Sequence, residues 1–340
     1  MLSLTSRRAS LRMQSTATWA YELLAACRPG LVAQPEPPPL QRLTGLPFAL
    51  AQTSVVRQGG PMNGQIAQAA ALVCHGNAIL RGMHPPTFWP TNSTAQFCDR
   101  ISFVRVARKW LGGWRSKTVA SAPDEWFVQM RQNEKRSLFL SHSPSGDSRL
   151  SDRLSSAFIG GGGNWLIEAA GSDARAHLWA ARWTVWNKKA KDRRIWRVEY
   201  GMVGEGKSSQ SQARLEEIQR ELTEALHEIR NFALEVKADS FADCFSRALE
   251  ALRSEGSKRS GYHKDLAPEG VLSTRAVSCL DACQSAWVFG GMGSWNDLGL
   301  EGETQGRYEH VSDRLFKALN ATIVAAANDS AVAPELQGRP

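Results

Sequence analysis

Eight consecutive residues, from Gly201 to Ser208, have the spacing of a phosphate-binding loop. They read GMVGEGKS and match the pattern G-x-x-x-x-G-K-[ST]. In such a loop, glycines let backbone N–H groups surround a phosphate, the lysine adds positive charge and the serine hydroxyl holds Mg²⁺. Under this interpretation the chain is a nucleotide-binding enzyme that uses Gly201, Gly206, Lys207 and Ser208.

The residues around this segment favour a different role. Polar and apolar side chains alternate from 195 to 203, whereas the parallel strand before a true phosphate loop is buried on both faces. The helical pattern that follows continues almost to the end of the chain, which leaves no strands to build a parallel sheet. We therefore expect a flexible linker between a hairpin and a helix, with nucleotide binding as the alternative.

Two similar glycine-rich segments, FIGGGGNW at 158–165 and VFGGMGSW at 288–295, each end in a tryptophan. Glycine permits positive φ angles and close approach of other groups, and loops held by rigid elements often carry binding residues. The plainer interpretation is a tight turn and a helix stop, each followed by a tryptophan that anchors the loop to the core. If the chain has a ligand pocket, we expect it at Trp165, Glu168, Trp295, Asn296 and Asp297.

A basic loop separates two strand-like segments that are rich in tryptophan. Trp179 and Trp183 fall on one strand face, and Trp186 and Trp196 lie near the loop. Aromatic side chains interleaved with cations suit stacking on bases and neutralising phosphates. The tip would then bind nucleic acid through Lys188, Lys189, Lys191, Arg193 and Arg194. The favoured alternative is that the tryptophans form the core face of a sheet and the cations solvate the loop.

No other combination of side chains identifies a catalytic or metal site. Cys279 and Cys283 lie one helical turn apart, with His263 nearby in sequence, but a zinc site needs a second well-spaced pair of ligands, which is missing. Neither G-x-S-x-G nor H-E-x-x-H occurs. We therefore predict no metal and no cofactor, assign no catalytic residue, and favour a protein without enzymatic activity.

The elements that must position these residues predict an α+β fold. Strand patterns rich in β-branched and aromatic residues occur at 101–106, 137–142, 176–186 and 195–203. Apolar residues three and four apart predict helices at 215–236, 241–252, 273–289 and 308–328. We expect a mainly antiparallel sheet within 62–205, a helical region at 206–330 packed on that sheet, and a flexible tail at 331–340.

The first 61 residues differ in composition from the rest of the chain. Seven of the fifteen prolines fall between Pro29 and Pro61, and Met1 to Ala20 contains serine and arginine but no acidic residue. We interpret residues 1–61 as a disordered or spurious leader, with Met62 as an alternative start. The other interpretations are a targeting peptide for an organelle and a structural arm.

Composition limits the classes of function. The net charge of +8 divides equally, because residues 1–61 carry 6 basic against 2 acidic side chains and the remainder carries 35 against 31. The nearly balanced body does not favour a broad phosphate-binding surface. No apolar run approaches the roughly 20 residues of a membrane span, and six scattered cysteines fit reduced thiols. We predict a soluble cytoplasmic binding protein whose partner is another protein, with no membrane attachment.

Overall fold

The fold is a sheet followed by a group of helices, as the sequence predicts. The computed structural model describes residues 62–108, 114–146, 150–172, 175–208, 214–254, 262–291 and 293–331. Strands dominate the first half of this part of the chain and helices the second. The expected α+β class is therefore confirmed. The interpretation of residues 1–61 as a leader and of 331–340 as a tail falls almost wholly outside the described residues.

Six strands form one mixed sheet in the order β2-β1-β6-β5-β4-β3. They are β1 (Cys98–Arg108), β2 (Trp114–Ala120), β3 (Ser137–Ser143), β4 (Asn164–Ala170), β5 (Arg175–Val185) and β6 (Trp196–Lys207). All neighbours pair antiparallel except β1 and β6, which pair parallel. The sheet is thus mainly antiparallel, as predicted, and β5 and β6 form the predicted hairpin.

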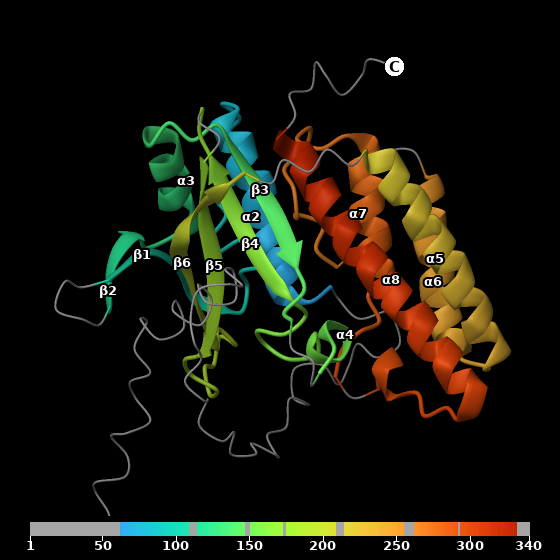
Figure 1. The fold of residues 1–340 in the computed structure, drawn as a ribbon. Coiled ribbons are helices and arrows are strands. Elements are labelled where there is room, and N and C mark those ends of the chain that lie inside the picture. The colour runs from blue at the N-terminus through green and yellow to red at the C-terminus, as the bar shows by residue number, and fades with distance from the viewer. Residues whose placement is uncertain are drawn as a thin grey trace, which may run out of the picture.

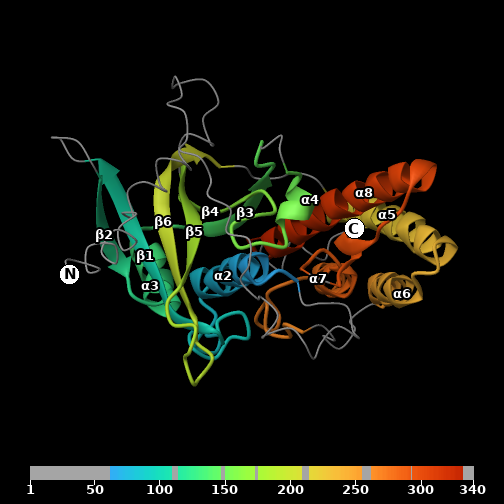
Figure 2. The same ribbon diagram turned by 90° about the horizontal axis from the view of Figure 1, so that it is seen from below.

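The helices lie in two groups (Figure 1). The longer ones are α2 (Gly64–Leu80), α3 (Pro123–Gln132), α5 (Leu215–Glu235), α6 (Asp239–Arg253), α7 (Thr274–Ala286) and α8 (Gly302–Asn328), and α4 (Asp152–Ser155) is a single turn. Helices α2 and α3 pack on the sheet, whereas α5 to α8 pack on one another. Figure 2 shows α2 between the sheet and the second group. The group of helices α5 to α8 therefore meets the sheet at its edge strand, β3.

An aromatic core lies between the sheet and its own helices. Phe103 of β1 stacks on Trp126 of α3 with ring centres 4.3 Å apart, and Trp179 and Tyr200 pack against the same group. Residues paired across neighbouring strands share a face, so Trp179 and Tyr200 fall on the side of Phe103. Trp179 of the hairpin therefore belongs to the core, which agrees with the favoured alternative to nucleic-acid binding.

Two asparagines join the helices to the edge of the sheet at β3. Asn77 of α2 accepts a hydrogen bond from the N–H of Leu138 at 2.7 Å and donates one to its carbonyl at 2.8 Å. Asn328 of α8 makes the same pair of bonds with Leu140, at 2.6 and 2.9 Å. Each side-chain amide thus replaces a missing neighbouring strand, which protects the edge from pairing with another chain.

Candidate binding groove

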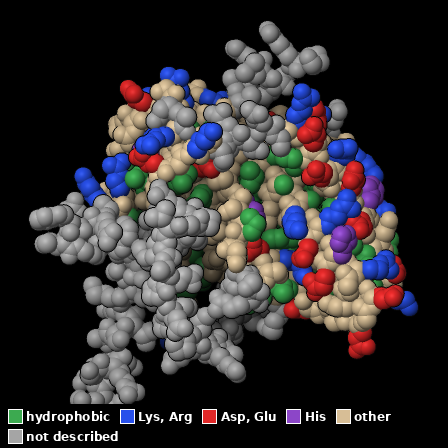
Figure 3. All heavy atoms as spheres, in the orientation of Figure 1, with side chains coloured by type: hydrophobic (Ala, Val, Ile, Leu, Met, Phe, Trp, Pro, Cys, Tyr) green, Lys and Arg blue, Asp and Glu red, His purple; other side chains and the backbone are tan. Residues whose placement is uncertain are grey.

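A groove with a volume of about 670 Å³ lies where the end of β3 meets α4, α5 and α8. Its apolar lining includes Ile218 of α5 and Phe316 and Val324 of α8. Figure 3 shows hydrophobic side chains in the middle of this side of the molecule and charged ones over the helices. A concave apolar surface with a few polar groups is the usual form of a binding site.

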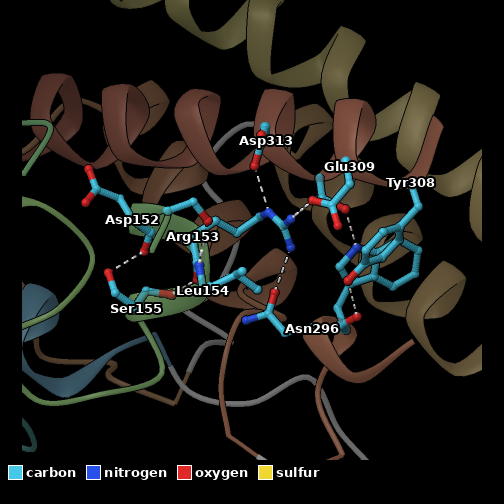
Figure 4. Close-up of polar contacts among 12 residues, drawn as sticks. Asp152, Arg153, Leu154, Ser155, Asn296, Tyr308, Glu309 and Asp313 are labelled. Carbon is cyan, nitrogen blue, oxygen red and sulfur yellow. Dashed lines mark hydrogen bonds and ion pairs between the residues drawn. The ribbon is translucent and has the colours of Figure 1, made fainter. Parts of the chain in front are cut away.

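Arg153 of α4 forms one wall and carries a charge that the protein itself neutralises. Its side chain is 2% exposed; its Nε donates to Asp313 at 2.7 Å, and a terminal nitrogen donates to Asn296 at 3.0 Å. A second terminal nitrogen pairs with Glu309 (Figure 4). Burial opposes the charge of Arg153, but Asp313 and Glu309 outweigh it and raise its pKa. Arg153 therefore fixes α4 on α8 and is not available as a free cation.

His142, at the end of β3, is held in a neutral form by its surroundings. Burial lowers its pKa, and its Nε2 lies 3.1 Å from the Gly162 carbonyl. A neutral ring donates to that carbonyl through Nε2, so Nδ1 keeps its lone pair. The indole of Trp165 lies 4.5 Å from the ring and donates to the same carbonyl. A Cβ on Gly163, which has φ of +90°, would lie 2.3 Å from His142 Nε2, so only glycine fits there.

Helix α5 presents two unpaired glutamates to the groove. Four of its six glutamates form ion pairs with arginines of α7 and α8, namely Glu216 with Arg275, Glu224 and Glu228 with Arg314, and Glu235 with Arg307. The other two, Glu217 and Glu221, both line the groove and have no ion pair with any described residue. They lie four residues apart, on one face of the helix.

Two further groove residues have buried polar atoms without a hydrogen-bond partner among the described residues. Asp152 of α4 accepts a bond from the N–H of Ser145 through one carboxylate oxygen, at 3.0 Å, but its other oxygen has no partner. Asn320 of α8 is 2% exposed, and neither its Oδ1 nor its Nδ2 has a partner. Buried polar groups in native proteins are almost always bonded, so such atoms require an explanation.

The ligand-binding residues predicted from the glycine-rich segments occupy separate places. Trp165 contacts His142 beside the groove, whereas Glu168 is buried in the middle of β4. Trp295 is fully buried, and its indole N–H donates to Ser312 at 2.7 Å. Asn296 accepts from Arg153, and Asp297 caps the turn that contains Trp295. None of the five lines the groove, and Trp295 acts as the core anchor of the plainer interpretation.

Sequence reasoning did not identify the residues that line the groove. Glu217, Glu221 and Arg153 have common residue types and no motif around them. Asn320 alone carried a usable signal, because it interrupts a helix face on which Phe316, Leu319 and Ile323 are buried. A polar residue inside an apolar stripe is a reason to search for its partner.

The segment that resembles a phosphate-binding loop is extended backbone. Gly201 pairs with Ala180, Gly206 pairs with Ala176, and Lys207 is the last residue of β6. Backbone groups committed to a strand ladder cannot surround a phosphate. Ser208 directly follows the strand, and α5 begins only at Leu215. The expectation that this segment is a flexible linker is therefore wrong, because 201–207 belong to a strand. This geometry also gives no support to the nucleotide-binding alternative.

The basic tip of the β5–β6 hairpin offers one exposed indole. Trp186 is 56% exposed, and the guanidinium of Arg197 lies 3.2 Å from the centre of its ring. Trp183 packs edge-on against Trp196. The five predicted nucleic-acid contacts lie in the turn between the strands, at Lys188, Lys189, Lys191, Arg193 and Arg194. With one face of Trp186 occupied by arginine and Trp179 in the core, the tip lacks a row of free aromatic faces.

Within the described residues, no three or more histidine, cysteine or acidic side chains are grouped to hold a metal ion. No helix in that part of the chain is long and apolar enough to cross a membrane. Comparisons of the chain with protein-family models, with curated proteins and with solved structures found no match.

Proposed function

We propose that this protein binds a segment of another protein in the groove between β3, α4, α5 and α8. The observation that carries the proposal is the Asn320 amide, which lines the groove with both polar atoms buried and with no hydrogen-bond partner among the residues that the structure describes. Leaving a buried polar group unpaired costs about 1–3 kcal/mol. A protein retains such a cost most readily where the group serves a site that is completed by a ligand.

The surroundings of Asn320 support a peptide-like ligand. The groove combines apolar side chains such as Phe316 and Val324 with polar groups at definite positions. The Asp152 oxygen without a partner among the described residues adds an acceptor from α4. An amide and a carboxylate in one groove match the donors and acceptors of a polypeptide backbone.

The test is a selection of random twelve-residue peptides displayed on phage against the full-length protein. Enriched peptides are then made with a fluorescent label, and their dissociation constants are measured by anisotropy. We expect peptides whose affinity falls at least tenfold in Asn320→Leu. Asn231→Leu serves as the matched control, because Asn231 is an exposed asparagine on α5 away from the groove. Peptides that bind Asn320→Leu as tightly as the wild type would refute the groove as the recognition surface.

A further inference from the structure

The way this protein uses its other asparagines indicates what Asn320 would bind. Asn77 and Asn328 each form two hydrogen bonds with a single residue of an extended strand, one to its N–H and one from its C=O. Both atoms of the side-chain amide are thereby satisfied by one residue of β3. An extended backbone offers this pair of groups, whereas a helical segment has already used them internally.

Asn320 lies on the same helix as Asn328, two turns towards the N-terminus. Two helical turns span roughly 12 Å, and β3 ends at Ser143, three residues beyond Leu140, the residue that Asn328 holds. The groove begins at this point, since His142 and Pro144 line it. Asn320 thus lies on α8 in the groove beside the end of β3, and no described strand residue makes a hydrogen bond with its amide.

The charges of the groove select among extended segments. Its acidic residues are Asp152, Glu217, Glu221 and Asp313, and its basic ones are Arg153 and Lys317, which leaves an excess of two negative charges with His142 neutral. Asp313 is already paired with Arg153. The acids without a cationic partner among the described residues are therefore Asp152, Glu217 and Glu221. A ligand with positive side chains would complement them.

We propose that the partner is an extended segment of another protein with apolar side chains and at least one lysine or arginine. One of its residues pairs with the Asn320 amide through N–H and C=O, its apolar side chains contact Phe316 and Val324, and its cation lies near Glu217 and Glu221. This inference rests on the proposed function, because it specifies the occupant of the same groove.

The backbone pairing is tested with N-methylated peptides. A peptide selected on the full-length protein is resynthesised with a single N-methyl group at each backbone nitrogen in turn, which removes one N–H donor. At one position we expect the affinity for the wild type to fall about tenfold, the loss that corresponds to one hydrogen bond. The same peptide should lose less than threefold against Asn320→Leu, which has no acceptor there. Equal losses in both proteins at every position would overturn the backbone pairing.

The charge selection is tested with the double variant Glu217→Gln/Glu221→Gln. We expect it to weaken the binding of a selected basic peptide about fivefold at low salt, because ion pairs with two exposed carboxylates contribute little each. The binding of a version with citrulline for arginine should be unchanged. Glu224→Gln is the matched control, since Glu224 is on the same helix but pairs with Arg314. If selected peptides depend on Asn320 but carry no cation and ignore this double variant, the groove remains the binding site and the basic segment is refuted.

Two further measurements would reveal other occupants of the groove. A synthetic peptide of residues 1–61 that displaces the labelled peptides at lower concentration than any of them would assign the groove to the chain's own N-terminal segment. A concentration-dependent dimer that Asn320→Leu abolishes would assign it to a second copy. Either result overturns the assignment to another protein while leaving the groove as a binding site.

Discussion

Replacing Asn320 by leucine should stabilise the free protein. Wild-type Asn320 buries two polar atoms that have no partner in the described part of the chain. A leucine of similar volume removes both atoms and adds apolar contacts with neighbours such as Phe316. Each unpaired group costs about 1–3 kcal/mol, so a gain of about 1–2 kcal/mol in the free energy of unfolding is expected after some loss from imperfect packing. Urea denaturation followed by far-UV circular dichroism measures it from the midpoint at constant slope.

Asn77→Leu is the matched control, because Asn77 is an equally buried asparagine on a helix but is fully bonded. Its replacement leaves the N–H and C=O of Leu138 without their partner and removes the amide donor to the Ser330 hydroxyl oxygen. We expect a loss of about 3 kcal/mol or more. A destabilisation of more than about 1 kcal/mol in Asn320→Leu would refute the reasoning, since it would mean that the Asn320 amide is satisfied in the free protein.

Three further predictions concern the scaffold and the rejected motif. Arg153→Met should lower the free energy of unfolding in urea by about 1–3 kcal/mol, because Asn296 loses its donor while Glu309 and Asp313, at 45% and 48% exposed, stay solvated; an unchanged midpoint would exclude Arg153 as the tie between α4 and α8. Burial lowers the pKa of His263 to about 4, below the roughly 6.5 of the unfolded chain. The stability that neutral His263 contributes is therefore complete above pH 6.5 and is lost as the pH falls towards 4. At pH 4.5 the free energy of unfolding has fallen by about 2.5 kcal/mol from this cause. The wild type should lose more stability than His263→Gln between pH 7 and 4.5, and parallel curves would contradict this. Lys207→Ala should leave the thermal melting temperature unchanged with and without Mg-ATP, and a nucleotide-dependent shift that disappears in the variant would restore the phosphate-loop interpretation.

Local periodicity was enough to predict most elements of this fold. Helix α5 follows from Leu222, Leu226 and Ile229, which recur every three or four residues and are all fully buried. The β5–β6 hairpin follows from alternation on both sides of a polar turn. In these segments the burial pattern alone selects the backbone conformation.

Non-local pairing accounts for the parts that periodicity could not predict. The parallel contact of β1 with β6 joins residues such as Phe103 and Tyr200, nearly a hundred positions apart, and leaves no mark in either segment. The same is true of Gly201 to Lys207, whose glycines permit a loop but which pair with β5 on both sides of an irregularity at Val203. A motif defined by a few residues contains no information about a neighbouring strand, although that strand forms hydrogen bonds with every second residue of the segment.

The groove could not be predicted from the sequence for a related reason. The six glutamates of α5 have the same side chain and the same helical spacing, yet four are neutralised by Arg275, Arg307 and Arg314. Only the packing of α7 and α8 decides that Glu217 and Glu221 have no ion pair within the part of the chain that the structure describes. The same holds for asparagine, since Asn77 and Asn328 face a strand and Asn320 does not. What distinguishes this surface is therefore the set of groups that the fold leaves without partners, and a ligand able to satisfy them must carry the donors and cations that the chain itself does not provide.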